Sequence, residues 1–287
     1  MKTQSWKRLL SLVAVAALAG LPYSAMAADN DLDGIDDAQE TGTPVTPLVF
    51  NGVTYSPCTA GMARNSCLSP TSKDIFIYLV TAPGGGFLGA NNLLAPEFLF
   101  KFITDPNVTV PDATVNTGKV DGLGVGVHVA FVTAEVLSSN RGVGTLGEKA
   151  VQIISDDDPN AFVFGAADVG TPTATGDARV WPVKIRNYVV NGGGTTADWQ
   201  KFIQRTYSHE LSHVAALTAT NDSRYGGYHY ATGSGVVMDQ NVVFNSKRKT
   251  FTIYDNYASG DRPCLLKVTP VTNPLTCVPL DPVIIVN

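Results

Sequence analysis

Hydrophobic and polar positions follow strand-like patterns over much of the chain. Residues 73–80 form a near-continuous run of apolar, β-branched and aromatic side chains, which predicts a buried strand. Similar patterns predict further strands at residues 124–133, 150–154, 161–165 and 250–254, and a strand or hairpin arm at 177–190. A sheet is therefore expected to supply much of the core.

Two segments have apolar residues at helical spacing instead. The first is residues 93–103, which ends at an Asp-Pro pair. The second follows a Gly-rich break at 191–196, where Thr195 or Thr196 can cap a helix and Asp198 falls in its first turn. Its apolar face continues to Leu217. Strands, a helix and then a long helix predict an α+β fold.

The long helix carries the pattern H-E-x-x-H at residues 209–213. Positions i and i+4 of a helix lie on one face, so His209 and His213 can bind one Zn²⁺ ion together. Glu210 then lies where it can act on a metal-bound water. The chain contains only four histidines, and three of them fall within 21 residues. This concentration predicts a catalytic zinc site.

A catalytic zinc site needs a third protein ligand, and two residues are candidates. His229 follows a Gly-Gly pair and precedes Met238, while Asp222 lies in a polar segment directly after the helix. Imidazole nitrogen and carboxylate oxygen both bind zinc. We favour His229 because imidazole suits Zn²⁺ well, and Asp222 is the alternative.

These residues resemble the zincin metallopeptidases. His229 followed by Met238 is similar to the metzincin arrangement, with Ala216 and Ala219 where the compact metzincin signature has Gly and His. The rival resemblance is of residues 219–226 to the aspzincin signature, in which Asp is the third ligand. The resemblance implies a zincin-like fold, with a twisted mixed sheet and an active-site helix. It also implies peptide hydrolysis by zinc-activated water with Glu210 as general base.

The first 27 residues have the features of a signal peptide. A basic start is followed by an apolar run, too short to favour a membrane span, and by an A-x-A cleavage site. Cleavage would remove three basic residues and no acidic ones, so the net charge would change from −5 to −8. Such an acidic protein is a poor candidate for binding nucleic acid. We expect a secreted or periplasmic protein without a membrane span.

An acidic loop follows the cleavage site and matches the calcium pattern D-x-[DN]-x-[DN]-G-x₅-E. Asp29, Asp31, Asp33 and Glu40 occupy its ligand positions, and Gly34 its turn position. The loop resembles a single thrombospondin type 3 calcium loop, which implies that Ca²⁺ stiffens the N-terminus.

Four cysteines complete the expected organisation. Export makes disulfides plausible, and we expect two local ones. They would join Cys58 with Cys67 and Cys264 with Cys277. The expected divisions are a signal peptide, a calcium loop, a metallopeptidase domain and a disulfide-closed tail, at residues 1–27, 28–45, 46–262 and 263–287.

The leading functional hypothesis is a secreted zinc endopeptidase acting on protein or peptide substrates. One alternative is a non-catalytic, calcium-stabilised surface or matrix protein with a zincin-like fold. Another is a zinc hydrolase that cleaves a non-peptide amide. Replacement of Glu210 by Gln would distinguish the catalytic hypotheses from the non-catalytic one.

Overall fold

The protein was analysed as a computed structural model. The structure describes residues 35–42, 47–81, 96–104, 119–120, 125–137, 140–143, 148–167, 177–214, 229, 235–239, 242–254, 257–258 and 284–286. None of the helices in these segments is both long and apolar enough to cross a membrane. The predicted signal peptide, three of the four calcium ligands, Asp222 and the second cysteine pair lie outside the described residues.

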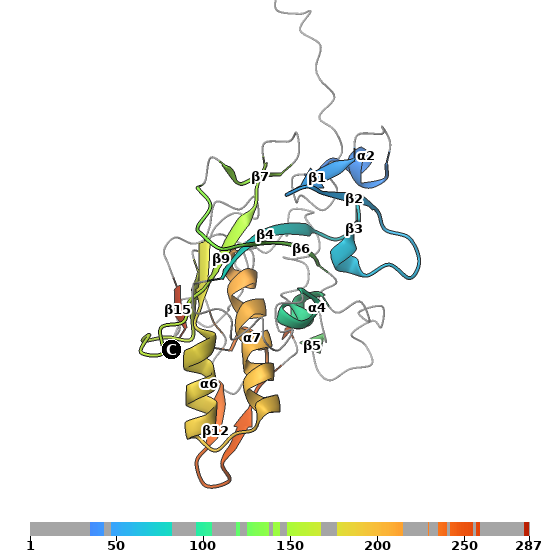
Figure 1. The fold of residues 1–287 in the computed structure, drawn as a ribbon. Helices are drawn as coiled ribbons and strands as arrows, with labels where there is room; N and C mark the ends of the chain where they lie inside the picture. Colours follow the sequence, from blue (N-terminus) through green and yellow to red (C-terminus); the bar gives the residue numbers. More distant parts are fainter. Residues whose placement is uncertain are drawn as a thin grey trace, which may run out of the picture.

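A six-stranded mixed sheet forms the centre of the fold (Figure 1). Its strands, in spatial order, are β15 (Ile284–Val286), β10 (Gly165–Ala167), β11 (Asp177–Val180), β9 (Val151–Ser155), β4 (Asp74–Thr81) and β6 (Gly126–Val132). The four strands from β11 to β6 run parallel, whereas β10 pairs antiparallel with both of its neighbours.

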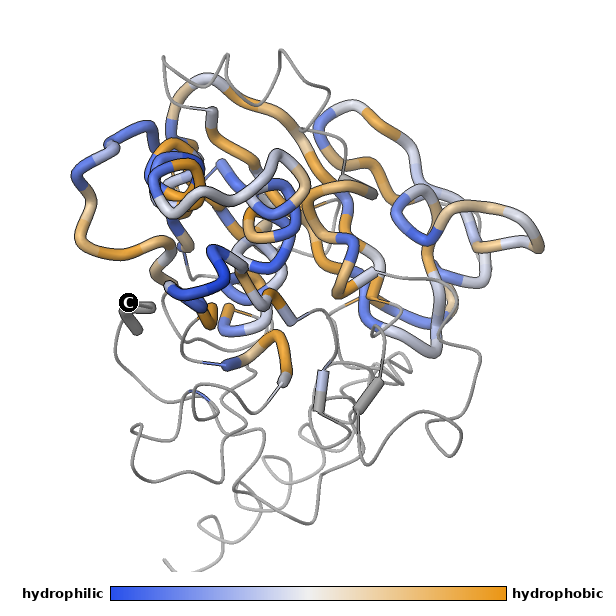
Figure 2. Tube along the Cα trace, turned by 90° about the horizontal axis from the view of Figure 1, so that it is seen from below, coloured by the Kyte–Doolittle hydropathy of each residue, from blue (hydrophilic) through white to orange (hydrophobic). Residues whose placement is uncertain are grey.

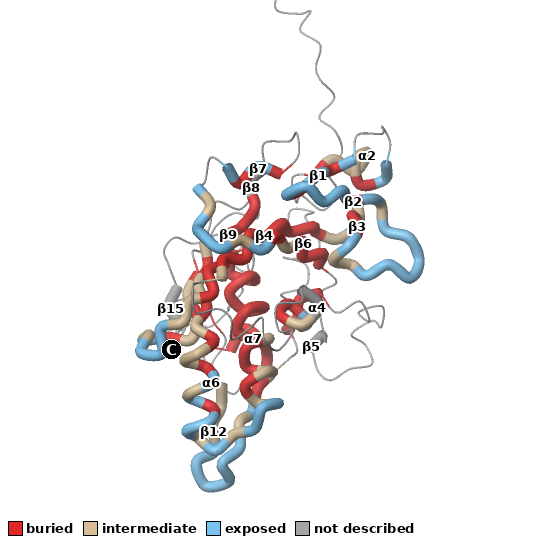
Figure 3. Tube along the Cα trace, viewed as in Figure 1, coloured by how far each residue is buried: buried red, intermediate tan, exposed pale blue. Residues whose placement is uncertain are grey.

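Strand β4 is buried on both faces, as its continuous apolar run predicts. Ile75, Ile77 and Leu79 face a core shared with the helices, while Phe76 and Tyr78 face a second core. The second core is closed by a three-stranded sheet of β1 (Leu48–Phe50), β2 (Val53–Pro57) and β3 (Cys67–Leu68). Figure 3 shows β4 and the upper part of helix α7 as the most continuously buried segments.

Four helices pack on the first core. They are α4 (Pro96–Leu99), α5 (Lys101–Thr104), α6 (Pro182–Asn191) and α7 (Thr196–Val214). Helices α6 and α7 lie side by side, and α7 contacts β10 and β11 (Figure 1). In Figure 2, hydrophobic and hydrophilic residues alternate within the turns of the helices, as amphipathic helices require. Helices on a mixed sheet confirm the α+β class, and the long helix is confirmed where it was expected.

Three details of the sequence analysis were wrong. Residues 177–190 are not one strand, because β11 ends at Val180 and α6 begins at Pro182. Proline is favoured in the first turn of a helix, and the buried positions of α6 then follow spacings of three and four. The described part of the helical segment expected at 93–103 consists of two short helices, α4 and α5, separated at Phe100. The strand expected at 161–165 begins only at Gly165.

Smaller elements complete the described structure. They are α2 (Asp37–Glu40), η1 (Arg64–Ser66), the hairpin of β12 (Val243–Asn245) and β13 (Thr250–Thr252), and the strand pairs β5 (Lys119–Val120) with β14 (Tyr257–Ala258) and β7 (Gly142–Val143) with β8 (Glu148–Lys149). The β12–β13 hairpin lies at the opposite end of α7 from β4 and β9 (Figure 1).

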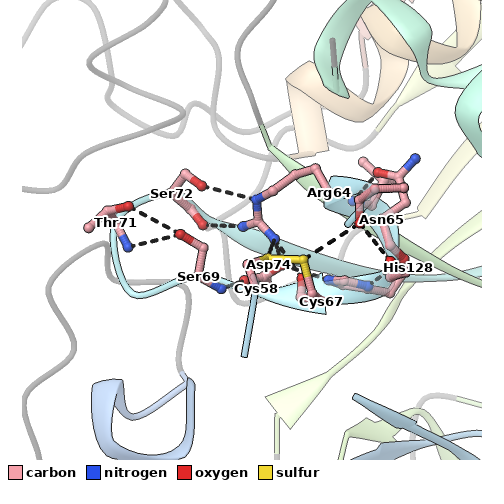
Figure 4. Close-up of a disulfide and its surroundings, with 12 residues drawn as sticks. Cys58, Arg64, Asn65, Cys67, Ser69, Thr71, Ser72, Asp74 and His128 are labelled. Carbon is pink, nitrogen blue, oxygen red and sulfur yellow. Dashed lines mark hydrogen bonds and ion pairs between the residues drawn. A yellow bond between two sulfur atoms is a disulfide. The ribbon is translucent and has the colours of Figure 1, made fainter. Parts of the chain in front are cut away.

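The predicted disulfide between Cys58 and Cys67 is present (Figure 4) and closes a loop whose helix η1 contacts strand β6. Arg64, within this loop, donates to Asp74 Oδ1 at 2.6 Å and to the Cys67 carbonyl at 2.7 Å. Asn65 accepts a hydrogen bond from the backbone of Val127 on strand β6 through its side-chain oxygen. The loop thereby covers part of the edge that β6 would otherwise expose.

Candidate metal centre

Helix α7 begins at a reciprocal cap. The Thr195 hydroxyl accepts a hydrogen bond from the Asp198 backbone N–H at 3.2 Å, and Asp198 Oδ2 accepts from the Thr195 backbone N–H at 2.7 Å. These bonds satisfy N–H groups that have no partner inside the helix, so the helix starts at a defined residue. The cap therefore fixes the N-terminal end of the helix that carries His209 and His213.

The other faces of the helix are also anchored. Tyr207 donates from its hydroxyl to Ser155 on β9 at 2.7 Å, which ties α7 to the central sheet. The Tyr257 hydroxyl donates to the Ser208 carbonyl at 3.2 Å and lies 2.8 Å from the Ser212 hydroxyl. All five residues are buried, so these bonds form in a low-dielectric environment where a lost partner is costly.

Three histidine side chains converge on one point beside this helix. His213 Nε2 lies 3.0 Å from His209 Nε2 and 3.2 Å from His229 Nε2. Candidate ligand atoms of the three residues all lie within 4.8 Å of one another, and all three side chains are buried. Residues 215–228 lie outside the described part of the chain. His213 and His229, which lie on either side of that segment in the sequence, are neighbours in space. The cluster is therefore a group that could hold a metal ion.

The tautomer of His209 is determined by a backbone carbonyl. His209 Nδ1 lies 2.8 Å from the Val237 oxygen, which can only accept a hydrogen bond. The proton of a neutral His209 ring therefore lies on Nδ1, and the lone pair of Nε2 points toward the other two histidines. Outer hydrogen bonds of this kind orient metal-binding histidines.

Residues 235–239 form a buried turn that contacts His209 of the cluster. The Asp239 backbone N–H donates to the Val236 carbonyl at 3.1 Å, and the Gly235 N–H donates to Asp239 Oδ2 at 3.2 Å. Gly235 has a φ of 87°, a left-handed value that favours glycine. Met238 in this turn is 1% exposed and packs in the core with α7.

The donor set and spacing suit a tetrahedral metal ion. Two imidazole nitrogens bound tetrahedrally to one Zn²⁺ ion at about 2.0–2.1 Å lie roughly 3.3–3.4 Å apart. The two measured Nε2 separations of 3.0 and 3.2 Å are close to that spacing. Burial, followed by the charge of Arg205, lowers the pKa of His229 to about 4. Burial also lowers the pKa of His209 well below its usual value. Both rings are therefore neutral near pH 7, the form that binds metals.

Glu210 lies on the same helix and is fully buried. Within the described part of the chain, neither of its carboxylate oxygens accepts a hydrogen bond. Burial raises its pKa well above the usual value, and the charge of Arg205 opposes this rise. The carboxylate packs directly against the backbone of β10, because a Cβ atom added at Gly165 would lie 2.3 Å from Glu210 Oε1. Glycine at position 165 leaves the space that Glu210 occupies.

Sequence analysis identified the three clustered histidines and Glu210. It missed Gly165, Arg205 and the hydrogen bonds of the 235–239 turn. Arg205 precedes His209 by four residues, so a search of the same helix face would have found it. No local pattern marks Gly165, because its neighbour Glu210 is distant in the sequence. Of the calcium ligands only Glu40 is described, and it is buried at the end of α2. The remaining histidine, His128, is buried between Asp74 and Asn65.

Comparison of the sequence with models of known protein families and with curated proteins finds no match. The metal centre is therefore argued from its residues alone.

Proposed function

We propose that the protein is an exported zinc-dependent endopeptidase with a zincin-type fold. The observation that carries this proposal is the convergence of three buried histidine Nε2 atoms beside Glu210. Three protein ligands leave one coordination position for water or substrate, which distinguishes catalytic from structural zinc sites. A long helix that bears His209, Glu210 and His213 and packs against a mixed sheet supports the fold assignment.

A bound Zn²⁺ ion would polarise the substrate carbonyl, activate a water molecule and favour the ionised form of the neighbouring carboxyl. His209, His213 and His229 would hold the ion, with His209 oriented by the Val237 carbonyl. Glu210 takes a proton from the attacking water and passes it to the leaving amine as the peptide bond breaks. Its burial excludes bulk water from these transfers.

Export and calcium binding belong to the same proposal. The N-terminal sequence supports export, and the Cys58–Cys67 disulfide fits an oxidising compartment. Asp29, Asp31, Asp33 and Glu40 would bind Ca²⁺, and Glu40 is the last residue of α2. The proposed substrates are proteins or peptides.

Zinc content and casein cleavage test the proposal. We expect about one zinc per chain in the purified protein. Glu210→Gln should keep the zinc and lower kcat by about 10²–10⁴-fold, because general acid–base catalysis contributes that much. Glu135→Gln, at a carboxylate 63% exposed, is the matched control and should change neither quantity.

Two outcomes would contradict the proposal. A wild-type protein that binds no zinc would refute the metal centre. A zinc-loaded wild type that cleaves neither casein nor a panel of peptides, with no difference from Glu210→Gln, would support the non-catalytic alternative. Cleavage of a non-peptide amide alone would reassign the substrate class and leave the zinc chemistry in place.

A further inference from the structure

A buried arginine lies one helical turn before the first histidine of the cluster. Arg205 precedes His209 by four residues on α7, so the two side chains lie on the same face of the helix. Its side chain is among the largest fully buried ones in the described part of the chain. A buried guanidinium destabilises a fold unless its donors form hydrogen bonds. The contact that Arg205 makes therefore indicates its role.

Arg205 contacts the same turn that orients His209. Its Nη2 donates to the backbone carbonyl of Asp239, while His209 Nδ1 donates to the Val237 carbonyl at 2.8 Å. The two donors are four residues apart on the helix, and the two acceptors are two residues apart in the turn. One face of α7 thus holds residues 235–239 at two points.

The turn can transmit a constraint from one of these points to the other. Asp239 is bonded to both Gly235 and Val236, so the turn is closed by its own hydrogen bonds. It is buried throughout, which leaves little room for its carbonyl groups to rotate independently. A bond that fixes the Asp239 carbonyl therefore also restricts the Val237 carbonyl.

We propose that Arg205 is a positioning residue for the metal centre, which acts by holding the 235–239 turn so that the Val237 carbonyl keeps His209 in its metal-binding orientation. The inference rests on the metal site of the proposed function. Arg205 holds the turn through the Asp239 carbonyl, and its charge also acts directly on His229. Partners that orient metal-binding histidines typically change metal affinity by about 10–100-fold when they are removed.

Two substitutions separate the geometry of Arg205 from its charge. Burial lowers the pKa of Arg205 to about 10, with Asp239, Glu210 and Tyr257 opposing the shift, so the side chain is charged at neutral pH. Arg205→Lys keeps a cation but loses the planar fork of donors. Arg205→Met removes both. Arg141→Met is the matched control, because Arg141 is also buried but donates to Asp177.

The first measurement uses the metal-free protein. The imidazole Nδ1–H of His209, held by the Val237 carbonyl, should give a slowly exchanging proton signal in nuclear magnetic resonance spectra. We expect its exchange to be at least tenfold faster in Arg205→Met and intermediate in Arg205→Lys. Arg141→Met should leave it unchanged. Unchanged exchange in a folded Arg205→Met protein would overturn the inference.

The second measurement is titration with Co²⁺, whose visible absorption reports ligand geometry, followed by competition with Zn²⁺. Arg205→Met should bind both ions about 10–100-fold more weakly than wild type, with an altered Co²⁺ spectrum. Wild-type affinity and spectrum would overturn the inference. If Arg205→Met fails to fold, the test uses Arg205→Lys instead. Proton exchange and metal affinity equal to those of wild type in Arg205→Lys would then overturn the inference.

Failure of the proposed function would be recognisable separately. A wild type that binds metal without cleaving peptides would refute the peptidase but leave the affinity comparison intact. A wild type that binds no metal would refute the metal centre. The proton-exchange measurement would still show whether Arg205 holds His209.

Discussion

The four histidines of the chain occupy two different kinds of buried site. His128 lies between two protein acceptors, with Nε2 2.6 Å from Asp74 Oδ1 and Nδ1 3.0 Å from the Asn65 carbonyl. In the cluster, by contrast, Nε2 of His213 faces the Nε2 atoms of His209 and His229. Both ring nitrogens of His128 thus face protein oxygen atoms, whereas the ring nitrogens of the cluster face one another and could bind a shared metal ion.

This difference teaches that burial alone does not identify a functional histidine. His128 is as deeply buried as His209, and its ring packs between Tyr55 and Phe76. The two histidines differ in the atoms that their ring Nε2 atoms face, which is a carboxylate oxygen for His128 and another imidazole nitrogen for His209. Carboxylate and carbonyl acceptors complete a structural site, and converging lone pairs form a metal site.

The largest expected effect comes from removing one histidine at each site. His209→Ala should weaken Zn²⁺ binding by more than about 100-fold, because losing a ligand costs more than losing one of its outer partners. His128→Ala should leave zinc affinity unchanged but lower the free energy of unfolding by about 1–3 kcal/mol, because it removes a buried hydrogen-bond partner of Asp74. Zinc titration and denaturant unfolding of both variants measure this. Equal loss of zinc affinity in both would contradict the comparison.

The His128 site should also determine part of the acid sensitivity of the fold. Burial alone would raise the pKa of Asp74, but hydrogen bonds and charges from His128 and Arg64 outweigh it and hold that pKa below its usual value of 3.8. The unfolded chain then takes up the proton first. The stability that Asp74 contributes is complete above about pH 4 and is lost as the pH falls through the folded pKa.

The free energy of unfolding, measured from neutral pH into the acid range, tests the direction of this pH dependence. Wild type should lose stability as the pH falls below about 4, and Asp74→Asn should be less stable at neutral pH with a flatter profile in that range. A parallel slope in the two proteins would show that other carboxyl groups dominate acid unfolding.

A smaller effect, confined to catalysis, is expected at Gly165. Gly165→Ala would place a Cβ atom 2.3 Å from Glu210 Oε1, so the carboxylate must move. A displacement of this kind should lower kcat by about 10²-fold while the zinc content is unchanged. The control is Gly192→Ala, where the added Cβ meets the Phe251 ring at 2.6 Å. This variant should lose some stability but keep its kcat, and an equal fall in kcat would contradict the role of Gly165.

The metal site could be predicted further from sequence than its surroundings could. Helical periodicity places His209 and His213 on one face, and Glu210 directly follows the first of them, because these spacings are local. The choice between His229 and Asp222 depended on how an intervening segment folds, which periodicity does not encode. His229 lies in the cluster, whereas Asp222 is outside the described residues.

The same reasoning explains which elements of the fold could be predicted. The strand at β4 was predictable because both of its faces are buried, which leaves a continuous apolar run. Helix α6 was missed because β11 ends only two residues before it begins, so that the apolar residues of the two elements form one continuous pattern in the sequence. Gly165 owes its importance to a contact across the sheet–helix interface, which no local pattern reveals.

The smallest effect on the cluster is expected from the disulfide. Cys58→Ala together with Cys67→Ala opens a loop with a sequence separation of 9, and loss of this cross-link should destabilise the fold by about 2–3 kcal/mol. Arg64 and Asn65 lie inside that loop and hold Asp74 and His128, so the change should weaken the structural site selectively. Chemical denaturation of wild type and of the double variant under the same non-reducing conditions should reveal the loss.

Co²⁺ titration of the same double variant completes the comparison. Its affinity should equal that of wild type, because the three histidines are held by α7 and the 235–239 turn and not by the disulfide loop. A fall in Co²⁺ affinity would mean that the two buried sites are coupled through the central sheet. The structural histidine would then contribute to the metal centre at a distance, and the separation drawn between the two sites would not hold.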